Sequence, residues 1–243
     1  MTRKKAQFLS VLFVVLFCIA VSGCSVTIQK GRRSDMEKIE SLEYEIEALN
    51  ARLAQLQQAK EDEISELDNA KKLLENQLKR EIGDKEVRLE MAEKGLAIIF
   101  LSEVLFDSGK TDIKKEANPS LDKVTKVLKE NLPGREIGIS GHTDNEPIKY
   151  SGWKSNWELS TARATSVLHY LVDERGVAPE KVSATGHGEY KPTASNNTPE
   201  GRRQNRRVEI LVLPNNMEKI QADMDNIAER KRKIQKQLKR YKK

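Results

Sequence analysis

Residues 136–144 read Glu-Ile-Gly-Ile-Ser-Gly-His-Thr-Asp, and residues 155–168 read Ser-Asn-Trp-Glu-Leu-Ser-Thr-Ala-Arg-Ala-Thr-Ser-Val-Leu. The first stretch alternates from Glu136 to Ser140, which predicts a β-strand. The second opens on Ser155 and has Glu158 three residues later, a capping box that begins an amphipathic helix. A strand followed closely by a capped helix is typical of layered folds that combine sheet and helix.

Further elements of the same kind lie on both sides of this unit. Residues 96–106 are apolar and predict a strand pair or a bent strand. Asn118 and Pro119 predict a helix start that ends before Pro133. We therefore expect a compact α/β layer fold over residues 96–214. Its remaining strands are predicted at residues 181–185 and 207–213.

A heptad pattern precedes this domain and predicts a coiled-coil spacer over residues 35–95. Ser34 with Glu37 reads as the capping box of a helix that runs to about Gly95, a length of ~90 Å at ~1.5 Å per residue. The helix either forms a homo-oligomer through this seam or docks as a single amphipathic helix on another element. Lys60 and Glu63 interrupt the seam, whose members are Ile39, Ile46, Leu53, Leu67 and Leu74 at a positions, with Leu42, Leu49, Leu56 and Ala70 at d positions.

The net charge of +6 belongs to the C-terminal residues 215–243, which hold ten basic and four acidic residues. The rest of the chain is neutral overall, so the charge is no sign of a nucleic-acid partner. We predict a basic C-terminal helix here. Its charged face is solvated, contacts anionic lipid head groups or wall carboxylates, or pairs with residues 35–82, which carry thirteen acidic and seven basic residues.

The N-terminus has the pattern of a secretion signal. Three basic residues at positions 3–5 precede the apolar run 8–21, which is short for a membrane span of ~20 residues. The run ends in Val-Ser-Gly-Cys at residues 21–24, which resembles the lipobox of bacterial lipoproteins. The resemblance implies a signal peptide over residues 1–23, a lipidated Cys24 and a linker over residues 24–34. An uncleaved helix that happens to contain a cysteine is the alternative.

Four motifs together resemble the OmpA-like peptidoglycan-binding domain, which also occurs in the peptidoglycan-associated lipoprotein and in the flagellar motor stator B subunit. They are Gly-His-Thr-Asp at 141–144, Asn-Trp-Glu-Leu-Ser-Thr-Ala-Arg-Ala at 156–164, Gly-His-Gly-Glu at 186–189, and Gly-Arg-Arg-Gln-Asn-Arg-Arg-Val-Glu-Ile at 201–210. The resemblance covers residues 96–214 and leaves out the spacer and the basic helix. It implies an α+β fold, an α/β sandwich with a mixed sheet of about four strands and two main helices. The loop 145–154 is longer than in many members and is closest to the stator B type.

The resemblance implies that Asp144 and Arg163 bind the ligand. A carboxylate and a guanidinium held close together suit a zwitterion, such as the amino-acid group that ends the diaminopimelate side chain of many peptidoglycans. Asp144 would take the ammonium, and Arg163 would hold the carboxylate in a bidentate fork. The remaining residues implied to line or reach this site are Asn156, Leu159, Thr143 and Asp107.

Structural roles compete with these assignments. Asp144 and Arg163 could form an ion pair that joins helix to strand. Arg206 and Arg207 lead into a strand, and we interpret them as structural. Trp153 and Trp157 suit stacking on a glycan, although packing is the commoner role of tryptophan.

The sequence therefore predicts a lipoprotein of the outer membrane, on its periplasmic face, that binds peptidoglycan non-covalently and tethers the envelope to the wall. Ser25 favours the outer membrane because an aspartate there commonly retains lipoproteins in the inner membrane. The alternatives are a stator B-like ion-channel subunit and a wall-cleaving enzyme. The candidate zinc ligands of such an enzyme are His142, Asp144 and His187, but no HExxH motif is present, and we expect no catalytic residues, metal or cofactor.

Overall fold

The computed structural model describes residues 3–149 and 152–242, with side chains from Arg32 onward. The lipobox and Cys24 lie outside the residues whose side chains it describes. Within the part of the chain whose side chains are described, no helix is both long enough and apolar enough to cross a membrane. The chain divides into two compact units, one formed by residues 59–217 and the other by residues 1–58 with 218–243.

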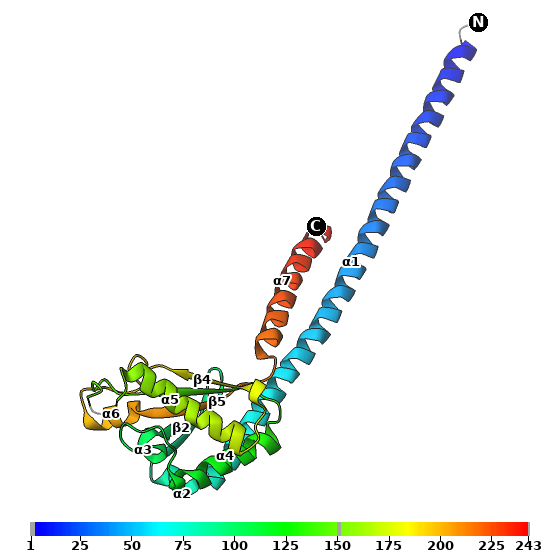
Figure 1. Cartoon of the computed structure of the whole chain (residues 1–243). Coiled ribbons are helices and arrows are strands. Elements are labelled where there is room, and N and C mark those ends of the chain that lie inside the picture. Colours follow the sequence, from blue (N-terminus) through cyan, green and yellow to red (C-terminus); the bar gives the residue numbers. More distant parts are fainter. Residues whose placement is uncertain (1–2, 150–151, 243) are drawn as a thin grey trace. The chain divides into compact units, whose positions relative to one another are not determined.

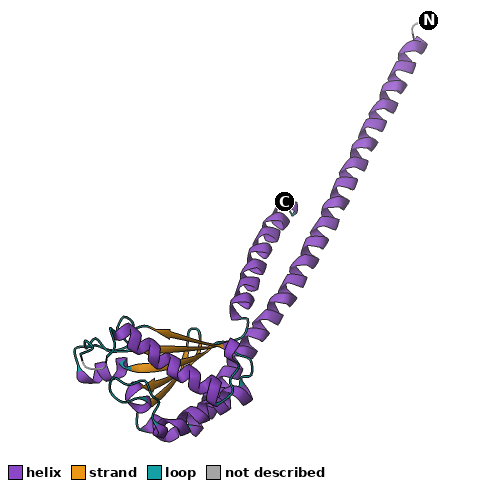
Figure 2. Ribbon diagram, viewed as in Figure 1, coloured by secondary structure: helices purple, strands orange, loops and turns teal. Residues whose placement is uncertain are grey.

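Residues 59–217 form a five-stranded mixed sheet with helices packed on it (Figures 1 and 2). The strand order is β1-β2-β5-β3-β4, in which only β3 and β4 run parallel. Ile98, Ile210 and Ile139 are register partners across the middle of the sheet. The strands are β1 (Val87–Ala92), β2 (Gly95–Leu101), β3 (Ile137–His142), β4 (Val182–Gly186) and β5 (Arg207–Val212).

The helices complete the element order of the chain. They are α1 (Arg3–Gln77), α2 (Lys79–Gly83), α3 (Ser102–Leu105), α4 (Asn118–Asn131), α5 (Asn156–His169), α6 (Pro199–Asn205) and α7 (Met217–Tyr241), with 3-10 turns at Lys115–Ala117 and Pro179–Lys181 and a π-helical turn at Tyr170–Glu174. The predicted α+β class is confirmed, and the sheet has one strand more than the four expected.

One apolar core joins the sheet to α4, α5 and the C-terminal part of α1. Leu121 of α4 and Val167 of α5 are fully buried against strand residues such as Ile139. Leu67 and Leu74 of α1 belong to the same core. The globular unit therefore includes part of the segment that the heptad pattern assigned to a spacer.

The prediction of a helix as far as Gly95 is wrong. The long helix ends at Gln77, and residues 87–92 form β1, which pairs antiparallel with β2. Lys85 has a positive φ of 59°, a left-handed backbone conformation that ends helical structure before this strand. Val87 and Leu89 pack on the core, which is the period-2 pattern of a strand.

Two other local predictions need correction. Ser34 lies inside α1, which begins at Arg3, so its capping box does not begin the helix. The apolar stretch 96–106 is a single strand followed by the helical turn α3, and no second strand forms there. The capping box at Ser155 is confirmed, because its hydroxyl accepts a hydrogen bond from the Trp157 N–H.

The heptad seam serves two different partners along the chain. In the first unit, Leu42 packs with Ile234 and Leu238 of α7, next to Ile39 and Ile46 of the same seam. Further along, the seam residues from Leu67 onward enter the globular core described above. The alternative of an amphipathic helix docked on other elements therefore describes the seam.

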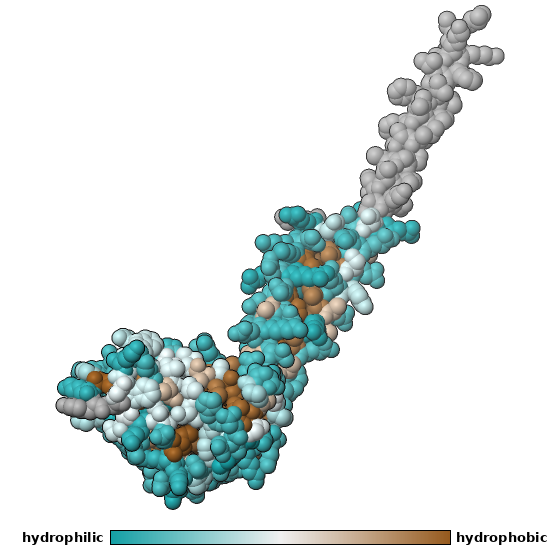
Figure 3. Space-filling model, in the orientation of Figure 1, coloured by the Kyte–Doolittle hydropathy of each residue, from teal (hydrophilic) through white to brown (hydrophobic). Residues whose placement is uncertain are grey.

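The predicted basic C-terminal helix is α7, and part of its charge pairs with the acidic face of α1. Arg230 Nε lies 2.6 Å from Glu45 Oε1, and Lys242 Nζ lies 2.7 Å from Glu43 Oε1. Figure 3 shows mostly hydrophilic atoms on this helix pair, with apolar side chains gathered along its middle. Pairing with the rod, one of the three roles considered for the basic face, is thus observed for these two residues.

Glu63, which interrupts the seam, fixes the helix to the globular unit. Its carboxylate accepts a hydrogen bond from the buried Arg135 at 2.5 Å and another from the backbone N–H of Asn215 at 3.0 Å. Glu66 binds the second terminal nitrogen of Arg135. The polar break is therefore a partly buried contact of the α1 residues that belong to the globular unit.

Candidate functional site

The site begins where the chain leaves the end of β3. The Thr143 N–H donates to the Gly188 carbonyl at 2.9 Å, which holds the strand end against the loop after β4. Asp144 follows and is only 6 % exposed. Its Oδ1 accepts from the Glu146 N–H at 3.2 Å, and its Oδ2 lies 2.6 Å from Arg206 Nη1.

The helix α5 lies unusually close to the ends of β3 and β4, and two glycines make this possible. A Cβ on Gly141 would stand 2.0 Å from the Ser160 carbonyl oxygen, and one on Gly186 would stand 2.1 Å from Thr161 Oγ1. Any larger residue would push the helix away from the sheet. These are the glycines that open two of the four sequence motifs, so they set the position of α5.

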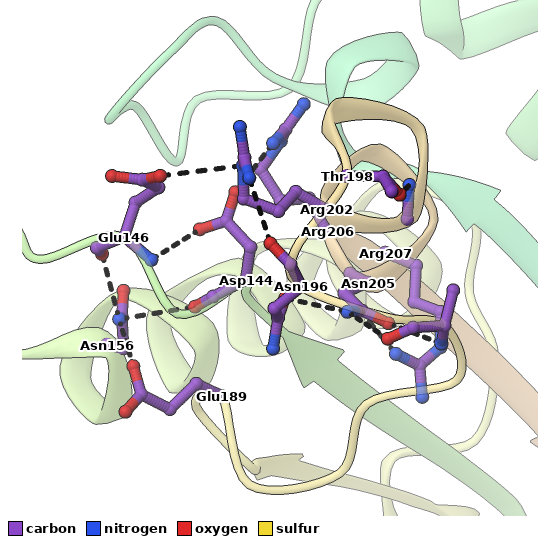
Figure 4. A network of polar contacts seen from close by, with 12 residues as sticks. Asp144, Glu146, Asn156, Glu189, Asn196, Thr198, Arg202, Asn205, Arg206 and Arg207 are labelled. Atoms are coloured by element: carbon purple, nitrogen blue, oxygen red, sulfur yellow. Dashed lines mark hydrogen bonds and ion pairs between the residues drawn. The ribbon is translucent and has the colours of Figure 1, made fainter.

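Three residues of α5 at positions i, i+3 and i+7 therefore face the end of β3: Asn156, Leu159 and Arg163. The Asn156 amide nitrogen donates to the carbonyls of Asp144 and Glu146 and to the Glu189 carboxylate, at 3.4, 3.1 and 3.0 Å. Figure 4 shows this amide between the loop after β3 and the loop after β4. The start of α5 thus ties both loops together.

These elements line a half-open cavity of about 730 Å³. All six residues that the sequence assigned to the ligand site border it, which brings together positions up to 56 residues apart. Their ligand-binding role stays a prediction. The residues that line the cavity are Ser102, Glu103, Phe106, Asp107, Ser108, Gly109, Lys110, Thr143, Asp144, Glu146, Pro147, Ile148, Lys149, Asn156, Leu159, Arg163 and Arg206.

Arg163 is the unusual group of this cavity, because it is a buried cation that makes no ion pair with any described carboxylate. Its side chain is 5 % exposed and, among the described residues, donates to the carbonyls of Lys110 and Asp107, at 3.1 and 3.4 Å. The guanidinium carbon lies 5.3 Å from the centroid of the Phe106 ring. Burial, helped by the positive charge of Arg206 and opposed by the negative charge of Asp144, lowers the pKa of Arg163 to about 10. The group is charged at neutral pH and is suited to an anionic partner.

Asp144 pairs with Arg206, and the alternative of an Asp144–Arg163 ion pair does not form. Arg206 lines the cavity, so our structural interpretation of this residue is incomplete. Arg207 points elsewhere: it is buried, lies 2.7 Å from the Glu209 carboxylate and donates to the Lys191 carbonyl. Arg206 caps the end of α6 and Arg207 begins β5, so the two neighbouring side chains meet different partners, which the motif alone did not distinguish.

Asp107 lies at the rim of the cavity. Its carboxylate is largely exposed and lies 3.3 Å from Lys114 Nζ. Its backbone carbonyl, not its carboxylate, contacts Arg163. The sequence reasoning missed Glu146 and Lys149, although both lie in the long loop that it had singled out.

The two candidate zinc-binding histidines lie beside the site, with ring centroids 4.9 Å apart. His142 is 3 % exposed, and burial together with the positive charge of Arg207 lowers its pKa to about 3. Within the described part of the chain, no three histidine, cysteine or acidic residues are grouped as metal ligands would be. His142 is thus a neutral, buried residue behind the cavity.

A mixed α+β domain with a half-open cavity, lined by an ion-paired carboxylate and by a guanidinium without an ion pair to any described carboxylate, has the features of the class of small-ligand binding domains. Residues 105–206 match the model of the OmpA family. The chain therefore carries an OmpA-family peptidoglycan-binding domain, of the type found in the periplasmic part of MotB and in OmpA-like proteins of the cell envelope.

Individual relatives cover the same part of the chain. Motility protein B of Bacillus subtilis is 44 % identical over 149 residues, which are 61 % of this chain and 57 % of that protein. Outer membrane protein Omp38 of Acinetobacter baumannii is 42 % identical over 105 residues, 43 % of this chain and 28 % of that protein. The chain thus spans only part of the length of both.

A solved structure agrees with the sequence relatives. The cell wall anchor of the T6SS from Pseudomonas aeruginosa is 33 % identical, with a TM-score of 0.53, and the match covers 58 % of this chain and 96 % of that one. Members of the OmpA and MotB family are generally non-enzymatic peptidoglycan binders.

Proposed function

We propose that this chain grips the diaminopimelate side chain of peptidoglycan in the cavity beside α5 and tethers the envelope to the wall. The observation that carries the proposal is the buried Arg163, which lacks a carboxylate partner and lies in one cavity with Asp144. A ligand carboxylate would form an ion pair with Arg163, and the ligand ammonium would share the Asp144 carboxylate with Arg206. A carboxylate has acceptor sites enough for both.

The size of the cavity supports this ligand. A volume of about 730 Å³ lies within the range of ~300–1,000 Å³ that is usual for small-ligand sites. The walls combine apolar surface from Phe106, Pro147 and Leu159 with the charged groups that fix orientation. An amino-acid side chain together with part of its stem peptide would fit.

The N-terminal sequence supports the second half of the proposal. A lipid on Cys24 would hold the chain in the outer membrane, on its periplasmic face, and α1 would lead from that anchor toward the wall-binding domain. The Pseudomonas relative is itself described as a cell wall anchor. Wall and membrane are then the two partners of the protein, and several copies on one mesh would gain avidity.

Co-sedimentation of the full chain, in detergent, with sacculi that contain diaminopimelate tests the wall-binding half. We expect the parent and the matched control Arg80→Ala, an exposed arginine of α2, to sediment with the sacculi. Asp144→Ala and Arg163→Ala should stay in solution while their circular dichroism remains that of the parent. Equal sedimentation of all four proteins would show that the cavity is not the binding site.

A second candidate function is a subunit of an ion-driven motor stator, which the 44 % identity to motility protein B favours. Such a subunit carries an ionisable residue within a membrane helix, whereas residues 6–24 contain no charge. Processing distinguishes the two. Globomycin blocks lipoprotein signal cleavage. Accumulation of the uncleaved precursor only when globomycin is added supports the lipoprotein, whereas an N-terminus that stays uncleaved without the inhibitor supports the stator-like subunit.

Wall cleavage is the remaining alternative, and the proposal is that this chain does not perform it. Incubation with sacculi and added zinc should release no soluble muropeptides. Release that depends on His142 or His187 would overturn this part of the proposal.

A further inference from the structure

Trp157 and Tyr190 form a stacked aromatic pair on the surface of the globular unit. Their ring centroids are 5.1 Å apart with 22° between the planes. Trp157 is nonetheless 47 % exposed and Tyr190 64 % exposed. The other large apolar residues exposed on the described part of this unit are single aliphatic side chains, Ile64, Leu73 and Met91. Stacking therefore does not remove the two rings from solvent, and the pair still presents much aromatic surface to it.

Rigid backbone holds both rings in place. Trp157 is the second residue of α5, and its N–H is held by the capping hydroxyl of Ser155 at 3.1 Å. The turn after β4 passes against the indole at Gly188, which has a positive φ of 54° and whose Cβ would lie 3.6 Å from Trp157 Cδ2. The Tyr190 N–H donates to the His187 carbonyl and closes the same turn. Ordering the rings for a ligand would thus cost little additional entropy.

Polar groups surround the aromatic surface. Trp157 also lines a shallow hollow of about 540 Å³, separate from the cavity beside Arg163. Its other walls include Thr111, Thr161 and Thr165, together with the carboxylate-bearing Glu158. The Thr161 and Thr165 hydroxyls donate to helix carbonyls and keep their lone pairs as acceptors. An aromatic face edged by hydroxyl and carboxylate oxygens matches a sugar ring, which has apolar C–H faces and a rim of O–H donors.

The aromatic pair is built on the same two segments as the candidate peptide site. Asn156, which lines the cavity, directly precedes Trp157, and Glu189 directly precedes Tyr190. Asn156 and Glu189 are joined by a hydrogen bond of 3.0 Å, visible in Figure 4. In the wall, a stem peptide is covalently attached to its glycan strand, so a sugar lies near any bound peptide.

We propose that Trp157 and Tyr190 form a carbohydrate subsite, which packs against a sugar ring of the glycan strand that carries the bound stem peptide. This inference rests on the proposed function and extends it from the peptide to the glycan. It also reassigns Trp157, whose commoner role would be packing. Trp153 by contrast is held within the fold by its polar edge, because its indole N–H donates to the Gly109 carbonyl at 3.0 Å.

Calorimetric titration of the full chain in detergent tests the subsite with three probes: the free stem peptide ending in diaminopimelate, the same peptide on its disaccharide, and the disaccharide alone. The parent should bind the disaccharide-peptide about 3- to 10-fold more tightly than the free peptide, as expected for one or two aromatic contacts. In Trp157→Ala that advantage should vanish, while affinity for the free peptide changes less than about twofold. Tyr190→Ala should reduce the advantage in part, and the control Met91→Ala should keep it.

The outcomes separate this inference from the function on which it rests. A parent that binds both peptides equally, or a Trp157→Ala variant that keeps the advantage, overturns the subsite and leaves the peptide site intact. A parent that binds the disaccharide but not the free stem peptide, and whose binding to sacculi does not depend on Arg163, overturns the proposed function alone. Binding of none of the probes overturns both. Trp157→Phe, which keeps an aromatic face, should retain most of the advantage and guards against loss through misfolding.

Discussion

Arg206 and Asp144 form the ion pair of the cavity, with 2.6 Å between Nη1 and Oδ2, although 62 residues separate them in the chain. Asp144 therefore has a cation beside it before any ligand arrives, whereas Arg163 has none of the described carboxylates as partner. The two halves of the proposed zwitterion site are thus unequal. The carboxylate half is satisfied and the guanidinium half is open.

Replacement of Arg163 by an apolar residue should stabilise the domain and abolish its binding. A buried charge without a counter-ion is unfavourable, so Arg163→Met is expected to raise the free energy of unfolding by about 1 kcal/mol. Urea unfolding followed by circular dichroism measures the stability, and sacculus co-sedimentation measures binding. Lower stability in Arg163→Met would mean that its two carbonyl hydrogen bonds outweigh the burial of its charge.

Arg206 should support binding less strongly than Arg163. Its side chain is more than a third exposed, so solvent screens its charge, but it holds Asp144 in place and adds positive potential near the ligand carboxylate. Arg206→Ala is therefore expected to weaken stem-peptide binding by about 3- to 10-fold. Titration of parent, Arg206→Ala and Arg163→Ala ranks the two arginines. Tighter binding in Arg206→Ala would show that Arg206 competes with the ligand ammonium.

The domain should lose stability on acidification because of His142. Its pKa is about 3 in the fold, compared with 6.5 for an ordinary histidine. Between these pH values the unfolded chain binds a proton that the folded chain does not, so stability falls as pH decreases from 6.5 toward 3, by at most about 1.4 kcal/mol per pH unit. Above pH 6.5 this residue contributes no slope.

Urea unfolding at several pH values, for the parent and for His142→Asn, isolates this contribution from that of the carboxylates. The difference in unfolding free energy between the two proteins should change over pH 3–6.5 and be constant above it. A difference that stays constant throughout would show that His142 is protonated in the fold.

The globular unit should require residues upstream of β2. Leu74 of α1 is fully buried in the domain core, so Leu74→Ala is expected to lower the unfolding free energy by about 2–5 kcal/mol. For the same reason a fragment of residues 96–214, which lacks β1 and α1, should unfold without a cooperative transition, whereas residues 59–217 should fold. A cooperative transition in the shorter fragment would place α1 outside the essential core.

The sequence by itself determined the local elements of the domain and the residues that gather around its cavity. Alternation in residues 136–140 and the capping box at Ser155 define β3 and the start of α5, because strand periodicity and capping depend on neighbours only a few positions away. The spacing of Asn156, Leu159 and Arg163 on one helix face follows from the same local geometry. The residues of β1 alternate between apolar and charged, which is a strand pattern, but their charge resembles that of the helical spacer before them, so the predicted helix extended over them.

The tertiary structure decided which partner each of these groups meets. The heptad seam of α1 predicted a buried stripe, yet only the fold divides it between α7 and the domain core, since an apolar stripe does not specify what covers it. In the same way, the family resemblance indicated Asp144 and Arg163, but the pairing of Asp144 with Arg206 depends on how β5 lies beside β3. Arg163 makes no ion pair with a described carboxylate because contacts across the sheet, which no local pattern encodes, place the Asp144 carboxylate against Arg206.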